Sequence, residues 1–200
     1  QDKAEAVAAT VRAAGREATV IHNLITSRAV AEVIAEAGGT PLRTRVGHSY
    51  IKAEMAEHDA VFGGEHSAHY YFRDFWFADT GMLAAMHVLA ALGEQSEQTL
   101  SELGARYERY VASGEINSRV GDVPEATARV EAAFTDRPGV RIDRLDGLTV
   151  IDEAGGWWFN LRASNTEPLL RLNAEAPDAV SMEKLRDEVL NLVRPSDDIR

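Results

Sequence analysis

Residues 18–62, ATVIHNLITSRAVAEVIAEAGGTPLRTRVGHSYIKAEMAEHDAVF, decide the fold of the first part of the chain. Three short segments in it are typical of strands: 18–22 and 60–62 are apolar runs, and 41–46 alternates between apolar and polar residues. A helical pattern that begins near the good N-cap Ser27 separates the first two runs, and a second helical pattern around Ile51 and Met55 separates the last two. Because strands alternate with helices, the segment predicts a layered, mostly parallel sheet.

From Gly114 onward the pattern changes to strands that are joined by turns. Leu148–Val150 and Trp157–Leu161 flank a Gly155–Gly156 turn, which is a hairpin signal, and Leu169–Ala176 forms a further strand. The chain is therefore expected to be α/β, with a layered, mostly parallel mixed-sheet domain followed by a smaller α+β domain with an antiparallel sheet. The expected domains are residues 1–113 and 114–200.

Two further helices are expected in the first domain. Ala4, Val7, Val11 and Ala14 fall at helical spacing near the start of the chain. The run Met82–Leu92 is almost wholly apolar, so it predicts a buried helix that ends at Gly93.

The composition excludes several classes of partner. The chain has 21 Lys+Arg against 32 Asp+Glu and a formal net charge of -11, which argues against nucleic acid and anionic membranes. It has no cysteine, so disulfides, thiolate metal sites and cysteine nucleophiles are excluded. No apolar stretch is long enough to span a bilayer, and the polar first residues do not resemble a signal peptide. We therefore expect a cytoplasmic protein.

The segment Gly63–His69, with the sequence GGEHSAH, is the first candidate binding loop. Two glycines after an apolar strand permit a sharp turn at the carboxyl end of that strand, where open α/β sheets bind ligands. Glu65 can accept hydrogen bonds from two vicinal hydroxyls, Ser67 can donate and accept, and His69 can bind or transfer a proton. A metal site made by Glu65, His66 and His69 is a weaker alternative, and a surface loop with incidental histidines remains open.

The segment Thr44–Lys52, with the sequence TRVGHSYIK, forms a second polar cluster. His48 lies just before a predicted helix, where it could contact an anion or a transferring proton. The alternative reading is a capping turn.

The segment Arg162–Pro168, with the sequence RASNTEP, is a candidate phosphate loop. Strand alternation places Arg162 on the face opposite Phe159 and Leu161, next to a tight polar turn. Backbone N–H groups, hydroxyls and a guanidinium suit a dianionic phosphate. A polar turn beside an arginine is the plainer alternative.

Taken together, these three loops resemble the α-D-phosphohexomutase family, and in particular bacterial phosphomannomutase/phosphoglucomutase. Their order and separation are similar to those of the family's third and fourth domains. SGEIN at 113–117, the Asp146–Gly147 pair and GWWFN at 156–160 add to the resemblance, which covers nearly the whole chain.

The resemblance implies roles by position. Glu65 and Ser67 would hold ring hydroxyls of the sugar, and His48 and His69 would be proton handlers at the reaction centre. The residues that would grip the phosphate not being transferred are Arg162, Ser164, Asn165 and Thr166. Such an enzyme passes a phosphoryl group between a phosphoserine and a phosphohexose, through a hexose 1,6-bisphosphate intermediate, with Mg²⁺ as cofactor.

The sequence also departs from the family pattern. Ala68 replaces a usual glycine, and Ile25 lies where a basic residue is often found, with Arg28 nearby. The family's phosphoserine loop and its Asp-Gly-Asp-x-Asp-Arg metal loop, both supplied by its domains I and II, do not occur in these 200 residues. The chain is therefore expected to have no metal site, to be inactive alone and to need those two domains as partners. A phosphoglucomutase, or a non-catalytic sugar-phosphate-binding module, is the alternative.

Overall fold

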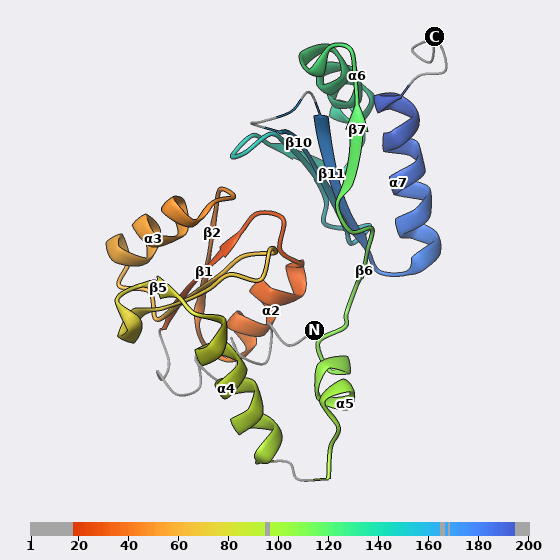
Figure 1. Cartoon of the computed structure of the whole chain (residues 1–200). Helices are drawn as coiled ribbons and strands as arrows, with labels where there is room; N and C mark the ends of the chain where they lie inside the picture. The colour runs from red at the N-terminus through yellow and green to blue at the C-terminus, as the bar shows by residue number, and fades with distance from the viewer. Residues whose placement is uncertain (1–17, 95–96, 165–166, 168, 195–200) are drawn as a thin grey trace. The chain divides into compact units, whose positions relative to one another are not determined.

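The computed structural model describes residues 18–94, 97–164, 167 and 169–194 (Figure 1). The chain divides into two compact units, Gln1–Arg109 and Tyr110–Arg200. The helix expected at residues 4–14 lies outside the described residues, as do Asn165 and Thr166.

The first unit is built on a mixed sheet with the strand order β2-β1-β3-β4-β5. Its strands are β1 (Thr19–Asn23), β2 (Thr40–Thr44), β3 (Phe62–Gly64), β4 (Tyr70–Phe72) and β5 (Ala78–Asp79). The first three strands are parallel, whereas β4 and β5 are antiparallel to their neighbours. This arrangement confirms the predicted mixed, mostly parallel layered sheet. The two-residue strand β5 was not predicted.

Helices cover both faces of this sheet. Helix α2 (Arg28–Glu36), which is capped by the Ser27 side chain as predicted, packs with Val20 and Phe62 on one face. Helix α3 (His48–Glu57) packs with Ile21 on the other, because successive strand residues point to opposite sides. Gly63 permits the close approach of α3. A Cβ at this position would lie 2.7 Å from side-chain atoms of both Ile51 and Met55.

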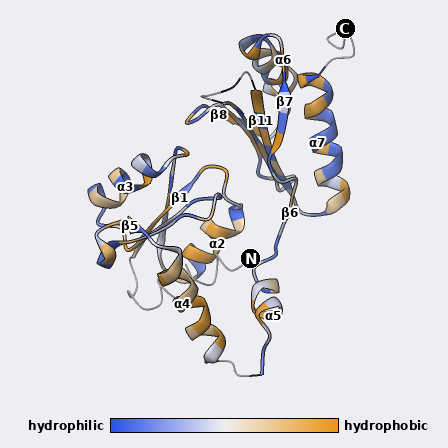
Figure 2. Ribbon diagram, viewed as in Figure 1, coloured by the Kyte–Doolittle hydropathy of each residue, from blue (hydrophilic) through white to orange (hydrophobic). Residues whose placement is uncertain are grey.

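Helix α4 (Gly81–Gly93) exists where the sequence predicts it, but the expectation that it is buried holds for one side only. Ala84, Val88 and Ala91 are buried, whereas Met82 and Met86 are 79% and 60% exposed. Figure 2 shows the helix as largely hydrophobic. A uniformly apolar helix has no polar face from which its orientation can be inferred, so the sequence could not reveal which side packs.

The last part of the first unit is joined to α2 by an arginine. Helix α5 (Leu100–Ala105) begins with a capping box made by Thr99 and Glu102. After it, Arg109 donates to Glu32 at 3.0 Å and to both carboxylate oxygens of Glu36 at 2.6 Å. A bidentate arginine pair of this kind fixes the segment against α2.

Among the described residues no helix is both long and apolar enough to cross a membrane.

The second unit is built on an antiparallel sheet with the order β6-β11-β10-β9-β8, and a further strand, β7, also pairs with β11. Its strands are β6 (Val111–Ala112), β7 (Ile116–Arg119), β8 (Val140–Asp143), β9 (Leu148–Asp152), β10 (Trp157–Ala163) and β11 (Leu169–Ala176). Helices α6 (Val123–Thr135) and α7 (Ala179–Val193) bury their apolar sides on one face, against Phe159, Leu161 and Leu172. The predicted α+β unit with an antiparallel sheet is confirmed.

His22 makes the stability of the first unit depend on pH. This residue of β1 is 7% exposed and lies opposite Arg43 on β2. Burial, and secondarily the charge of Arg43, lowers the pKa of His22 to about 4. Between pH 6.5 and pH 4 the unfolded chain therefore binds a proton that the folded unit does not. The free energy of unfolding should fall across this range as the pH is lowered, by about 3 kcal/mol at most.

The variant His22→Leu should lose most of this dependence. Native-state hydrogen exchange of the β1 amides at several pH values reports the free energy of opening the unit. His58→Gln, which changes an exposed histidine at the end of α3, is the matched control and should retain nearly the whole drop. An equal drop in His22→Leu and in the unmodified chain would show that His22 is not the responsible group.

Candidate functional site

The predicted sugar loop is a tight hairpin between β3 and β4. The Glu65 N–H donates to the His69 carbonyl at 3.0 Å, and the Ala68 N–H donates to the Glu65 carbonyl at 3.1 Å. Ala68 has φ 66°, in the left-handed region. A turn followed by one left-handed residue is a common three-residue hairpin loop, in which glycine usually occupies the left-handed position. The hairpin therefore brings Glu65, Ser67 and His69 together on one short loop.

The Glu65 carboxylate is buried, with 3% of the residue exposed, and accepts hydrogen bonds from β4 and from the turn before α3. Its Oε1 accepts from the Tyr71 hydroxyl at 2.7 Å, and its Oε2 accepts from the Gly47 N–H at 3.1 Å. Burial, and secondarily the hydrogen bond to Glu65, raises the pKa of the Tyr71 phenol far above its usual value, so the hydroxyl keeps its proton. Gly47 is the N-cap of α3, so Glu65 joins the sugar hairpin to the turn that holds His48.

His48 is the first residue of α3, and the structure places it in an exposed position at the helix N-terminus. The preceding N–H, that of Gly47, is the group that Glu65 binds. Within the same turn, the Arg45 guanidinium lies over the Tyr50 ring at 4.8 Å from its centroid. The predicted turn before the helix is present, and the hydrogen bond from the Gly47 N–H to Glu65 joins it to the hairpin.

His69 lies between a hydroxyl and a carboxylate. Its Nδ1 is 2.9 Å from the Ser67 Oγ, and its Nε2 is 4.0 Å from the Asp79 Oδ2. Asp79 also accepts from the Tyr70 N–H at 2.8 Å, which fixes it at the start of the β4–β5 pairing. An imidazole with these two neighbours can exchange a proton and is held in orientation. The sequence did not single out Asp79, because β5 is too short to leave a periodic signal.

A further buried side chain ties the hairpin to β1. Asn23 is 1% exposed, and its Oδ1 accepts from the Thr26 hydroxyl at 2.7 Å and from the His66 N–H at 3.4 Å. Ile25, where the family often has a basic residue, is 6% exposed and belongs to the core. The nearby Arg28 has its Nε 3.7 Å from Glu32.

The candidate phosphate loop begins at a pair of arginines. Arg162 on β10 is directly opposite Arg171 on β11, and the Arg171 guanidinium lies 3.4 Å from the Ser164 Oγ and 3.5 Å from Glu115. Within the described part of the chain, the Nε of each arginine is buried without a hydrogen-bond partner. Like charges directly opposite each other on a sheet are destabilising. Such a pair is favoured where an anion binds between or beside the guanidinium groups.

Two features fix the strand ends from which this loop starts and to which it returns. The Ser164 N–H donates to the Leu169 carbonyl at 2.8 Å, which closes the loop at its base. Gly147 packs against the strand that holds Arg162. Its φ is 75°, and a Cβ there would lie 2.5 Å from the Leu161 carbonyl oxygen. Only glycine fits this close approach. Asn165 and Thr166, the other predicted phosphate ligands, lie outside the described residues. The sequence did not indicate Arg171 as a candidate, because its place opposite Arg162 depends on strand register.

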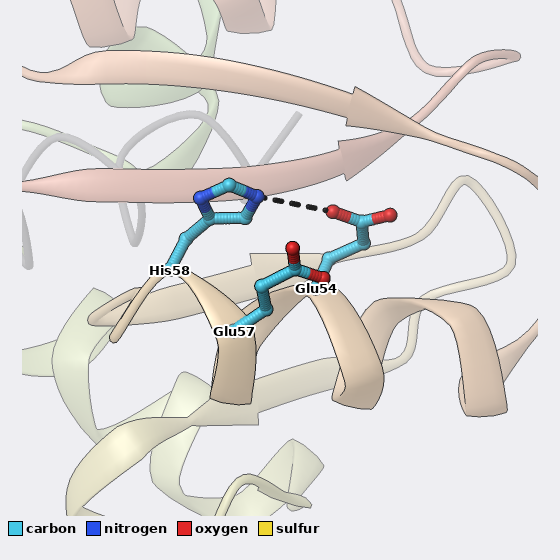
Figure 3. A group of neighbouring side chains, drawn as sticks. All are labelled: Glu54, Glu57 and His58. Atoms are coloured by element: carbon cyan, nitrogen blue, oxygen red, sulfur yellow. Dashed lines mark ion pairs between the residues drawn. The ribbon is translucent and has the colours of Figure 1, made fainter.

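The alternative metal site is not formed. Among the described residues, one group of His, Asp or Glu side chains has all its ligand atoms within 4.8 Å, and it consists of Glu54, Glu57 and His58 (Figure 3). This group does not include Glu65, His66 or His69. It lies on the surface at the C-terminal end of α3, where His58 and Glu54 form an ion pair at 3.4 Å. Two glutamates and a histidine are not the oxygen-rich set that Mg²⁺ prefers.

Comparison with known proteins identifies the family. The model described as "Phosphoglucomutase/phosphomannomutase, alpha/beta/alpha domain III" matches residues 2–110, and the model for the C-terminal domain of the same family matches residues 115–192. The chain belongs to the phosphoglucomutase/phosphomannomutase family.

Sequence relatives from this family align with most of the chain. "Phosphohexose mutases" of Xanthomonas campestris is 43% identical over 177 residues, which is 88% of this chain and 39% of the relative. A phosphomannomutase of Methanocaldococcus jannaschii is 39% identical over 180 residues, which is 90% of this chain and 39% of the relative. The chain thus spans about two fifths of the length of these relatives and corresponds to a C-terminal part of the family.

Solved structures agree with this assignment. A phosphoglucomutase/phosphomannomutase family protein of Burkholderia thailandensis has a TM-score of 0.78 and 26% identity, over 98% of this chain and 42% of its own. N-acetylphosphoglucosamine mutase of Aspergillus fumigatus, in complex with GlcNAc-6P and magnesium, has a TM-score of 0.65 and 15% identity, over 96% of this chain and 46% of its own. The second likeness shows the fold alone.

Ala68 strains the hairpin, because its backbone is left-handed, and a glycine at this position should relieve the strain. A left-handed alanine costs about 1 kcal/mol relative to glycine, part of which is offset by the greater entropy of glycine in the unfolded chain. Ala68→Gly should therefore stabilise the first unit by up to about 1 kcal/mol. The change in the free energy of unfolding is measured by urea unfolding that is monitored through hydrogen exchange of the β3 and β4 amides.

Ala53→Gly is a control of opposite sign. Ala53 is exposed in the middle of α3, where glycine costs about 1 kcal/mol. If Ala68→Gly destabilised the unit as much as Ala53→Gly, the hairpin would not hold residue 68 in the left-handed conformation.

Proposed function

We propose that the chain is the C-terminal sugar- and phosphate-binding half of a phosphomannomutase, an isomerase that interconverts mannose 6-phosphate and mannose 1-phosphate. The observation that supports this best is the arginine pair, Arg162 opposite Arg171, beside a loop of hydroxyl and amide side chains. Relatives named phosphomannomutase support the choice of mannose.

In this proposal the second unit binds the phosphate that is not transferred. Arg162 offers a planar fork of donors that matches phosphate oxygens, and Arg171 adds a second positive charge at hydrogen-bond range of Ser164. Asn165 and Thr166 would complete the set, as the family resemblance implies. A dianion would also relieve the repulsion between the two opposed guanidinium groups. The net acidic charge of the whole chain makes such a local positive pocket necessary.

The first unit would bind the sugar ring. Glu65 and Ser67 would accept and donate hydrogen bonds to ring hydroxyls, and His69 and His48 would handle protons at the reacting oxygen. Asp79 would hold the His69 ring in place. Fixing a hexose by two hydroxyls and its far phosphate would allow either end to be presented to one phosphoryl donor.

The phosphoryl donor and the metal would come from elsewhere in the longer protein. In this proposal, family domains I and II supply a phosphoserine and a Mg²⁺ site, and a hexose 1,6-bisphosphate is the intermediate. The described residues do not fit Mg²⁺: Glu54, Glu57 and His58 lie about 9 to 15 Å along α3 from His48, with the wrong donor set. The 200-residue chain alone should therefore bind phosphohexoses without converting them.

The proposal is tested by Arg162→Ala in the chain. Removing one guanidinium should weaken binding of both mannose 6-phosphate and mannose 1-phosphate by about 10- to 100-fold at low salt, measured by calorimetry. The thermal stability of the second unit should not fall, because the like-charge pair is removed. Arg141→Ala on β8, which removes an exposed arginine with acidic neighbours, is the matched control. Equal affinity in Arg162→Ala would favour the polar-turn alternative.

The second candidate is a phosphoglucomutase of the same family, because the matching family model includes both activities. Mannose and glucose differ at the 2-hydroxyl. Competition between mannose 1-phosphate and glucose 1-phosphate in the full-length protein separates the two. Preferential turnover of glucose 1-phosphate would replace the phosphomannomutase proposal with the phosphoglucomutase. Normal binding but no turnover of either sugar by the full-length protein would favour the non-catalytic sugar-phosphate-binding module.

A further inference from the structure

Helix α4 is bordered by an apolar groove with a volume of about 310 Å³. The groove is lined by residues of α4, by Leu100 of α5 and by Tyr70 of β4, and none of the described residues that line it is charged. The side chains that α4 contributes are those of Ala84, Ala85, Val88 and Leu89. The groove therefore offers an apolar partner an almost uniformly apolar wall.

Large apolar side chains continue this surface along the helix. Met82, Met86 and Leu89 are 79%, 60% and 64% exposed. Because they are four and three residues apart, they form one stripe along α4. A stripe of large apolar side chains beside an apolar groove is typical of a surface that another segment covers.

Residues 1–17 of the same chain, which precede the described part, match this surface in sequence. Ala4, Val7, Val11 and Ala14 fall at helical spacing. A helix over these positions would be about 16 Å long, and the 13 residues of α4 are about 20 Å long. A helix as short as this is marginal in water unless its apolar side is packed against another element.

Ala18 places the end of this segment on the side of the sheet that α4 covers. It is 8% exposed, and it belongs to the core cluster that includes Ala84 of α4. Strand β1 begins at the next residue, so residues 1–17 lead directly into this cluster. The family model for this domain matches residues 2–110, which makes the segment part of the same domain as α4.

We propose that residues 4–14 form a helix that packs in the groove beside α4, with Val7 and Val11 directed toward Met86 and Leu89. The alanines of the segment allow close approach of the two helices, and flexible methionine side chains fill irregular space between them. This inference is independent of the proposed function, because no residue of the hairpin or of the phosphate loop takes part in it.

The first test is methyl NMR of the unmodified 200-residue chain. Nuclear Overhauser effects are expected between the methyl groups of Val7 or Val11 and those of Met82, Met86 or Leu89. These contacts need no variant, so they test the inference even if a substitution prevents folding.

The second test is Val11→Glu, which places a charge in the apolar contact. Hydrogen-exchange protection of the α4 amides should fall about 10- to 100-fold, and the Met86 methyl resonance should shift. Ala9→Glu is the matched control, because a helix over this segment turns residue 9 away from Val11 and toward solvent. It should leave both signals unchanged. The methyl resonances of Met55 and Met182, which are buried elsewhere, are internal references.

Each outcome decides the inference. Overhauser effects from the segment to α4, with loss of protection in Val11→Glu but not in Ala9→Glu, support it. Absence of those effects overturns it. Contacts to α4 that appear only with a concentration-dependent dimer in sedimentation would assign the groove to a second copy of the chain. Stripe methyl groups that stay accessible to a soluble paramagnetic agent would leave the stripe to the rest of the longer protein. Both of these results would also overturn the inference.

Discussion

The first unit depends on one buried negative charge, the Glu65 carboxylate. A carboxylate with so little exposure is tolerated only where donors satisfy it, and here two of them come from the strand behind the hairpin and from the turn before α3. Satisfying this charge therefore joins three segments that are separate in sequence. The position of His48 relative to the hairpin is a consequence of the same interaction.

The second unit places two positively charged side chains opposite each other. Arg162 and Arg171 are cross-strand neighbours on a sheet whose other face is a conventional apolar core. Two like charges directly opposite each other cost stability, and the Glu115 carboxylate, 3.5 Å from Arg171, faces one of the two. The arrangement makes physical sense if an anion is part of the working state. The two units thus offer different groups, a buried carboxylate near a serine and a histidine in one and a pair of arginines in the other.

Much of this could be predicted from the sequence, because the relevant signals are local. The parallel strands have apolar runs, α2 has its Ser27 cap, and the alternation in β10 correctly separated Phe159 and Leu161 from Arg162. Glu65, Ser67 and His69 lie within five consecutive residues, so their proximity was already contained in the sequence.

The features that the sequence did not predict depend on contacts between neighbouring strands. Arg171 meets Arg162 only through strand register, and Asp79 reaches His69 only because β5 pairs with β4. Tyr71 meets the Glu65 carboxylate only because β4 pairs with β3. The exposure of α4 was also mispredicted, since its apolar composition gives no direction.

The most direct test of the account is an amide NMR titration of the isotopically labelled chain, first with inorganic phosphate and then with mannose 6-phosphate. The account predicts that both ligands shift the amides around Ser164 and Arg171, whereas only the sugar phosphate shifts those of Gly47, Ser67 and His69. If mannose 6-phosphate left the hairpin amides where inorganic phosphate leaves them, recognition of the sugar by the Glu65 hairpin would be contradicted.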